Sequence, residues 1–130
     1  MGRIDLTEKE VMSSCKNRLT YWENCKVVIH FDRINSGKVQ ISGRWIQLAK
    51  IGSPDLVAYI NYNNTCYIYF IECKRTSGGI TSDAQLEFAI KFRGLLNVIY
   101  EVVTNPKQID ITIEKLTSYT ANELKKITMD

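Results

Sequence analysis

The chain has 130 residues, of which 45% are hydrophobic and 24% charged, and its formal net charge is +3 at pH 7. A chain of this length buries roughly two thirds of its unfolded surface, so we expect one domain over residues 1–130 with a single core. Its apolar runs fall well short of the ~20 residues that span a bilayer, and its first residues lack the pattern of a secretion signal, so we expect no membrane contact and a cytoplasmic location.

The first part of the chain predicts one helix followed by short strands. Residues Thr7–Tyr21 have apolar side chains at helical spacing behind a Thr-x-x-Glu capping box, which predicts an amphipathic helix. The β-rich segment Lys26–Phe31 is separated by a turn signal from Lys38–Ile41, and we expect these two segments to pair as a hairpin. A second turn then leads to Arg44–Leu48.

The middle of the chain predicts the centre of a sheet. Asp55–Ile60 and Thr65–Cys73 are apolar strands joined by a polar turn, so we expect them to be neighbours, with the second strand central. A Ser82-x-x-Gln85 capping box then opens a helix. Its apolar side chains, which we expect to face mostly one way, are Ala84, Phe88, Ile90, Leu95 and Leu96. Asn97–Val103 predicts a further buried strand.

The end of the chain leaves one element open. In Gln108–Leu116, three isoleucines alternate as in a strand, yet the segment is also compatible with a helix. Thr120–Ile127 predicts a short final helix. The order of helix, strands, helix, strand and helix indicates an α/β fold.

Four cysteines and one histidine are the chain's soft metal ligands, and their spacing does not predict a zinc site. We expect the cysteines to be reduced, with several of them in the core. His30 lies inside a predicted strand, and we expect it to be structural. Tyr67 and Tyr69 alternate with Ile68 and Phe70, so at least one of these two sets should belong to the core.

Two carboxylates and a lysine suggest the chemistry. Strand alternation sends Glu72 and Lys74 to one face of their strand, while Cys73 points to the other face. Asp55 opens the adjacent strand, and a hairpin would bring its carboxylate beside Glu72. Neighbouring carboxylates repel each other unless a cation joins them, and oxygen ligands favour Mg²⁺ or Mn²⁺. Such a site can hydrolyse a phosphodiester, with Lys74 orienting water or offsetting charge on phosphorus. The alternative is an exposed Glu72–Lys74 ion pair at a strand end.

These residues also resemble a known nuclease signature. Ser53-Pro54-Asp55 followed by Glu72-Cys73-Lys74 is similar to the PD-(D/E)xK motif of the restriction-endonuclease-like nucleases. Together with Arg33-Ile34-Asn35-Ser36-Gly37, Gly79-Ile80-Thr81-Ser82 and Gln85, this set resembles the stand-alone phage type of the virus-type replication-repair nuclease (VRR-NUC) domain. The resemblance covers about residues 7–104 and implies a mixed β-sheet flanked by α-helices.

The resemblance also implies roles for individual residues. Asp55, Glu72 and the backbone carbonyl of Cys73 would bind the metal, Lys74 would be the catalytic lysine, and Gln85 would support the site or only cap its helix.

The family places a further metal-binding glutamate on its first helix, where this chain has Glu8 and Glu10. We choose Glu8 because it shares the helix face of Met12, Cys15 and Leu19. Alternatively, Glu8 is only a favourable acid in the first turn of a helix, where it interacts with the helix dipole and takes no part in catalysis.

The implied activity is a Mg²⁺- or Mn²⁺-dependent DNA endonuclease of a phage, selective for branched DNA such as four-way (Holliday) junctions and acting as a homodimer in the host cytoplasm. A nicking, flap-directed or nonspecific DNA nuclease, an inactive nucleic-acid-binding module and a structural protein are the alternatives. Arg33, Arg44 and Arg75 are candidate contacts to DNA phosphates. Trp45 could stack on a base or sugar, but it is more typical of a core residue.

Overall fold

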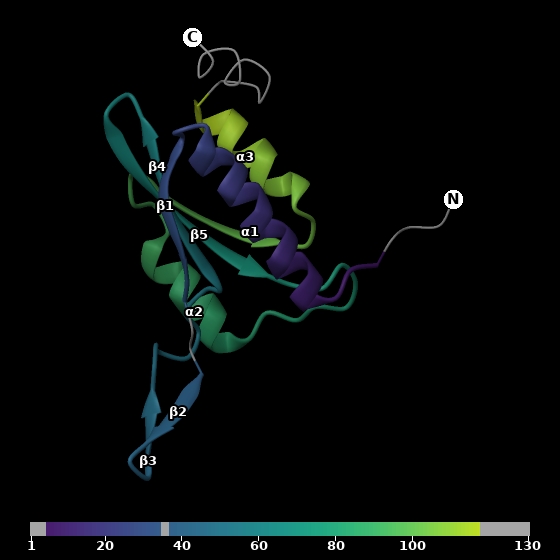
Figure 1. Ribbon diagram of the computed structural model, residues 1–130, viewed down its shortest axis with the longest axis vertical. Helices are drawn as coiled ribbons and strands as arrows, with labels where there is room; N and C mark the ends of the chain where they lie inside the picture. The colour runs from purple at the N-terminus through teal and green to yellow at the C-terminus, as the bar shows by residue number, and fades with distance from the viewer. Residues whose placement is uncertain (1–4, 35–36, 118–130) are drawn as a thin grey trace.

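A computed structural model describes residues 5–34 and 37–117 (Figure 1). The described helices are α1 (Glu8–Asn24), α2 (Asp83–Phe92) and α3 (Lys107–Thr117), and the described strands are β1 (Val28–Arg33), β2 (Lys38–Ile41), β3 (Arg44–Gln47), β4 (Leu56–Tyr62), β5 (Thr65–Cys73) and β6 (Val98–Val103). The helix expected over Thr120–Ile127 lies outside the described residues. Within the described ranges, no helix is long and apolar enough to cross a membrane.

Four strands form a mixed sheet in the order β1-β4-β5-β6. β4 pairs antiparallel with β1 and β5, whereas β5 and β6 are parallel. Helices α1 and α3 cover one face of this sheet and α2 lies on the other, so the fold has three layers (Figure 1). The predicted α/β class and the central position of Thr65–Cys73 are confirmed.

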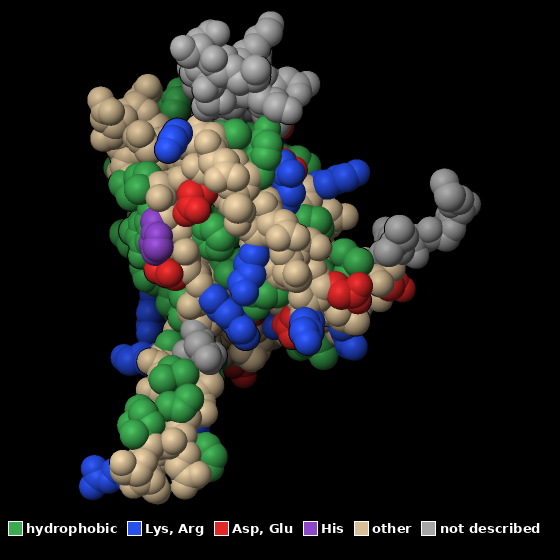
Figure 2. Space-filling model, viewed as in Figure 1, with side chains coloured by type: hydrophobic (Ala, Val, Ile, Leu, Met, Phe, Trp, Pro, Cys, Tyr) green, Lys and Arg blue, Asp and Glu red, His purple; other side chains and the backbone are tan. Residues whose placement is uncertain are grey.

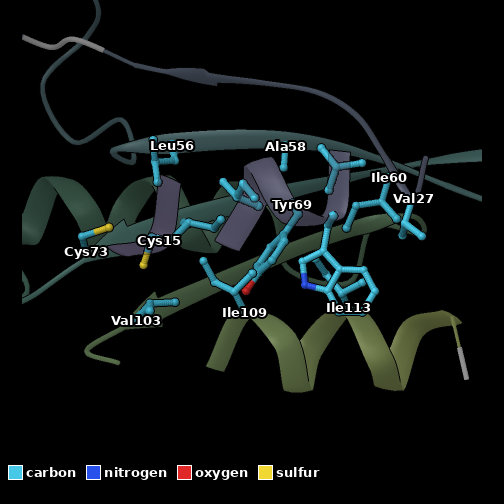
Figure 3. Close-up of a cluster of buried hydrophobic side chains, with 14 of the residues drawn as sticks. Cys15, Val27, Leu56, Ala58, Ile60, Tyr69, Cys73, Val103, Ile109 and Ile113 are labelled. Carbon is cyan, nitrogen blue, oxygen red and sulfur yellow. The ribbon is translucent and has the colours of Figure 1, made fainter. Parts of the chain in front are cut away.

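The main core lies between the sheet and the pair α1 and α3. Strand alternation directs Ala58 and Ile60 of β4 and Tyr69 of β5 into this layer, where all three are buried. Figure 3 shows these side chains packed between the sheet and α3. Tyr67 packs against the same core, which confirms that the tyrosine set of β5 faces inward. Cys15 and Cys73 are free and buried there too, as expected.

Helix α1 begins where the sequence predicts but continues to Asn24. The Thr7 hydroxyl accepts a hydrogen bond from the Glu10 backbone N–H, and both halves of the capping box are present. The extra turn is stabilised by tertiary contacts: Trp22 is buried, and its indole N–H donates to Asp110 of α3 at 2.8 Å. Arg18 pairs with the same Asp110 oxygen at 2.9 Å. These contacts join residues distant in sequence, so the local pattern could not predict them.

The predicted hairpin of Lys26–Phe31 with Lys38–Ile41 is wrong. β1 pairs with β4 instead, and β2 pairs with β3 through a two-residue turn at Ser42 and Gly43. Both turn residues have positive φ, 51° and 77°, as the favoured hairpin turns require. The short β2–β3 hairpin closes a smaller loop than the predicted pairing would. It projects away from the three layers (Figure 1).

The segment Gln108–Leu116, for which the sequence allowed a strand or a helix, lies within helix α3. A helix places Ile109 and Ile113, four residues apart, on one face, and both are buried, whereas Ile111 is exposed. The helical spacing of Ile109 and Ile113 therefore matches burial, whereas the strand-like alternation through Ile111 does not. Thr112 of the same helix donates its hydroxyl to Glu101 of β6 at 2.9 Å.

The predicted apolar face of α2 is only partly correct. Ile90, Leu95 and Leu96 are exposed, and the helix ends at Phe92 before the two leucines. Phe88 and Phe92 instead pack on Phe70 of β5, with ring centroids 5.1 and 4.9 Å away. Aromatic packing thus fixes this helix against the sheet. The face that contacts the sheet contains Phe88 and Phe92, and the apolar spacing alone did not identify it.

Gly52 allows the loop before β4 to approach the start of α2. Its φ is +97°, and a Cβ atom built there would lie 2.4 Å from the backbone oxygen of Ala84. Only glycine fits both the conformation and the space. This contact holds the segment that leads into Asp55 against the first turn of α2.

We predict that Gly52→Ala destabilises the protein by about 2 kcal/mol or more, since strain at positive φ adds to a backbone clash. Gly94→Ala is the matched control, because Gly94 has φ +78° but nothing within 4 Å of its added Cβ. Urea denaturation of both variants measures the difference. Equal losses of unfolding free energy would show that the approach to Ala84 is not tight.

Candidate metal centre

The candidate site lies at the end of the sheet where β4 begins and β5 ends. Asp55 immediately precedes β4, and the pairing of Leu56 with Ile71 brings it opposite the end of β5. Its Oδ2 accepts a hydrogen bond from the backbone N–H of Cys73 at 2.7 Å. The backbone oxygen of Asp55 also accepts from Ile34 N–H at 2.7 Å, so Asp55 is held from both neighbouring strands.

Glu8 reaches this site from the first turn of α1. One carboxylate oxygen each from Glu8, Asp55 and Glu72 lies within 4.8 Å of the other two. The segment before α1 is fixed by two hydrogen bonds between Leu6 and Thr76, a residue that follows β5. Glu10 instead closes the capping box. The structure therefore brings Glu8, and not Glu10, together with the two strand carboxylates.

Lys74 and Glu72 share a face and are joined by Gln85 of α2. The Gln85 amide nitrogen donates to Glu72 Oε1 at 2.7 Å, and its oxygen accepts from Lys74 Nζ at 3.0 Å. Lys74 Nζ also lies 3.7 Å from Glu72 Oε1, with side chains only 12% and 3% exposed. This burial excludes the alternative of an exposed ion pair.

Gln85 caps α2 and contacts the site at the same time. Its Oε1 accepts from the Ser82 backbone N–H at 2.9 Å, and the Ser82 hydroxyl accepts from Gln85 N–H at 3.2 Å. The orientation of the amide follows from its partners, because two donors face Oε1 and a carboxylate faces Nε2. The capping and supporting roles are therefore compatible.

The buried Glu72 carboxylate is electrostatically unfavourable when ionised. Burial first, and then the negative charge and hydrogen bonding of Asp55, raise the pKa of Glu72 from 4.5 to about 8, although Lys74 opposes the shift. Within the described residues, no donor contacts its buried Oε2. A cation between these carboxylates would satisfy that oxygen and relieve the repulsion.

The donor set fits a hard divalent cation. Carboxylate oxygens are the ligands that Mg²⁺ and Mn²⁺ prefer. The Cys73 thiol is buried in the α1 layer, where a hydrogen bond with Cys15 and burial raise its pKa, so it is no thiolate ligand. His30 is exposed on β1, where it contacts Asp32 at 3.0 Å and stacks on Tyr59. It takes no part in the acidic cluster.

Two pockets meet at Glu8. The first, of about 490 Å³, is lined by Glu8, Lys9, Met12, Ser13, Lys16, Arg33 and Asp55. The second, of about 320 Å³, is lined by Glu8, Lys74, Arg75, Gly78, Gly79 and Ile80. Figure 2 shows Lys and Arg side chains gathered on the face between α1 and the β2–β3 hairpin. Each pocket therefore combines cations with at least one carboxylate of the cluster.

Two of the three arginines predicted to contact DNA lie near the carboxylates, and the third does not. Arg33 lines the first pocket and Arg75 the second, where the Arg75 guanidinium donates to the Gly78 carbonyl at 2.7 Å. Arg44 begins β3 on the projecting hairpin and is not brought to the carboxylates. Trp45 beside it is 68% exposed, so the expectation of a core tryptophan is wrong. Among the described residues, β2 and β3 form a sheet of their own, which leaves this side chain outside the three layers (Figure 1).

Three residues near the site were not predicted from the sequence. Lys9 and Lys16 could have been found, since together with Ser13 they recur at positions i, i+4 and i+7 of a predicted helix. Tyr100 could not, because it depends on parallel pairing of β5 with β6. Burial and the negative charges of Glu72 and Asp55 raise the pKa of Tyr100 to about 12. The tyrosine therefore stays protonated beside the site.

Comparisons with family models, with curated proteins and with solved structures found no match to this chain.

We predict that, in chelator, the unfolding free energy falls as pH rises from about 5 to about 9. The Glu72 pKa is raised to about 8 in the folded protein, so its contribution is complete below its ordinary value of 4.5 and is lost as pH rises through the folded value. Glu72→Gln should remove much of this fall, because glutamine cannot ionise.

The measurement is urea denaturation at several pH values, with and without Mg²⁺. Saturating Mg²⁺ should stabilise the wild type most at high pH and should not stabilise Glu72→Gln to the same extent. Glu87→Gln, which changes an exposed carboxylate of α2, should keep the wild-type profile. A wild-type stability that rises over this pH range in chelator would contradict the assignment.

Proposed function

We propose that this chain is a Mg²⁺- or Mn²⁺-dependent DNA endonuclease with a restriction-endonuclease-like fold of the VRR-NUC type. The observation that carries the proposal is the convergence of Asp55 with Glu72, which is joined to Lys74 through hydrogen bonds of Gln85. Their side chains come from the start of β4, the end of β5, the residue after it and the first turn of α2. A merely structural role does not require three carboxylates to lie so close together.

The residues that would hold the cation are Glu8, Asp55, Glu72 and the backbone carbonyl of Cys73. When bound, Mg²⁺ or Mn²⁺ polarises a phosphodiester oxygen and makes the attacking water easier to deprotonate. Because Glu72 has a raised pKa, it must lose a proton before it can serve as a ligand. Metal affinity should therefore increase with pH.

Lys74 supplies positive charge where the reaction develops negative charge. Its side chain is 12% exposed and lines the pocket beside Glu8, so an ammonium there is poorly screened by water. Gln85 Oε1 accepts a hydrogen bond from Lys74 Nζ and thereby fixes the direction of the lysine side chain. The remaining donors can contact a phosphate oxygen or orient water. In this account Gln85 is a positioning residue, since its amide reaches the phosphate only through Lys74 and Glu72.

We propose branched DNA as the substrate, cut by a homodimer in the cytoplasm. One acidic cluster supports one cut, whereas resolving a four-way junction requires two symmetric cuts, and a two-fold dimer supplies both. The chain shows no separate reading domain within its described residues, which favours recognition of DNA shape over base sequence.

We predict that Lys74→Met lowers the single-turnover cleavage rate of a four-way junction by about 100-fold or more, because the cation that offsets transition-state charge is lost. Lys115→Met, an exposed change on α3, should leave the rate within about two-fold of wild type. Gel assays with labelled junction, linear duplex and single strand in Mg²⁺, Mn²⁺ or chelator measure both variants.

Cuts in paired positions of the junction, dependent on metal, would support the resolvase activity. Equal cleavage of every substrate would support a nonspecific nuclease in its place. The proposal of an enzyme is contradicted if wild-type protein that binds metal cuts none of these DNAs.

We predict that Glu8→Gln weakens Mn²⁺ binding by about 10-fold or more, whereas Glu10→Gln leaves it unchanged. Both variants remove one first-turn carboxylate from α1, so the loss of a favourable helix-dipole interaction is matched. Isothermal titration calorimetry with Mn²⁺ reports the affinity. Equal affinities for the two variants would leave Glu8 with only its role in the helix.

A further inference from the structure

Three residues of α1 form a polar stripe that points into the larger of the two pockets. Lys9, Ser13 and Lys16 lie at positions i, i+4 and i+7, and all three line the pocket that also contains Arg33 and Asp55. Lys9, Ser13 and Arg33 are exposed and Lys16 is half-buried. The α1 wall of this pocket therefore presents two cations and a hydroxyl, and Arg33 of β1 adds a third cation.

Two carboxylates, Glu8 and Asp55, line the same pocket, but they form no close ion pair with its cations. Among the described residues, none of Lys9, Lys16 and Arg33 forms an ion pair with a carboxylate. Arg18, on the same helix but outside the pocket, is by contrast paired with Asp110. Three cations against two carboxylates leave the pocket with net positive charge, and cations that share a concave surface attract anions because their fields add inside a hollow.

The arrangement around the carboxylates suits a polymer of phosphates. Glu8 lines both pockets, so this carboxylate of the acidic cluster lies between the α1 wall and the second hollow, which holds Lys74 and Arg75. A single small phosphate would occupy only one of these hollows. A DNA strand that crosses the carboxylates would place one phosphate at the cluster and its neighbours against cations on either side.

We propose that the pocket beside α1 binds a backbone phosphate of the cleaved DNA strand, adjacent to the phosphate that is cut. Lys9, Lys16 and Arg33 contact this phosphate or its neighbour through charge-assisted hydrogen bonds, and Ser13 donates from its hydroxyl. The proposal rests on the proposed nuclease function, because it takes the reacting phosphate to lie at Glu8, Asp55 and Glu72. These contacts hold the strand in register and carry no base information.

The test compares Lys9→Gln/Lys16→Gln with Lys107→Gln/Lys115→Gln, which removes the same charge from exposed positions of α3. Fluorescence anisotropy measures binding to a labelled DNA junction in Ca²⁺, between about 50 and 200 mM salt. We expect the α1 variant to bind about 10-fold or more weakly and its salt slope to fall by about 2, because two phosphate contacts are lost. The α3 variant should bind within about two-fold of wild type.

Single-turnover cleavage in Mg²⁺ on the same variants separates this proposal from the proposed function. Weaker half-saturation by DNA with an unchanged maximal rate in the α1 variant supports the pocket. If the wild type cuts no DNA but the α1 variant still binds DNA more weakly, the proposed nuclease function is contradicted and the phosphate site is supported.

Wild-type affinity and half-saturation in the α1 variant would overturn the proposal. So would an equal loss in the α3 variant, since net charge alone would then explain binding. The proposal would also be overturned if, in a parallel assay with an RNA duplex, the α1 variant lost binding to RNA but not to DNA.

Discussion

Burial of the Glu72 carboxylate is the constraint on which the site depends. A buried charge is unfavourable unless it is paired and hydrogen-bonded, and Glu72 is only partly compensated. Gln85 and Lys74 approach one of its oxygens, while burial and then the negative charge of Asp55 raise its pKa. The chain thus holds an electrostatic conflict that a divalent cation would relieve. Such a conflict lowers the stability of the metal-free protein, and its relief would favour the binding of a cation.

The fold maintains this conflict by fixing each partner from a different segment. Asp55 is held between Ile34 and Cys73, and Gly52 keeps its loop against the start of α2. Packing of Phe88 and Phe92 on Phe70 holds Gln85 over the end of β5. Because these partners lie on separate elements, none can move away to relax the repulsion without breaking a hydrogen bond or a packed contact.

Features set by local chemistry could be predicted from the sequence. The alternation in Glu72-Cys73-Lys74, the two capping boxes and the choice of Glu8 over Glu10 by helix face all follow from spacing within one element. Pairing between distant elements could not be predicted. β1 joins β4 across more than twenty residues, and the closer pairing with Lys38–Ile41 was the wrong choice. Burial depends on such pairing too, which is why Trp45, Ile90 and Leu96 were misplaced and Tyr100 was missed. The nuclease activity itself stays a prediction.

The most direct test of the account is a crystal of the protein soaked in Mn²⁺ and measured for anomalous scattering. We expect an anomalous peak bounded by Glu8, Asp55 and Glu72, within coordination distance of the Asp55 and Glu72 oxygens. The same soak of Asp55→Asn should give a much weaker peak. Ordered carboxylates with no peak between them at saturating Mn²⁺ would contradict the central claim that this cluster is a metal site.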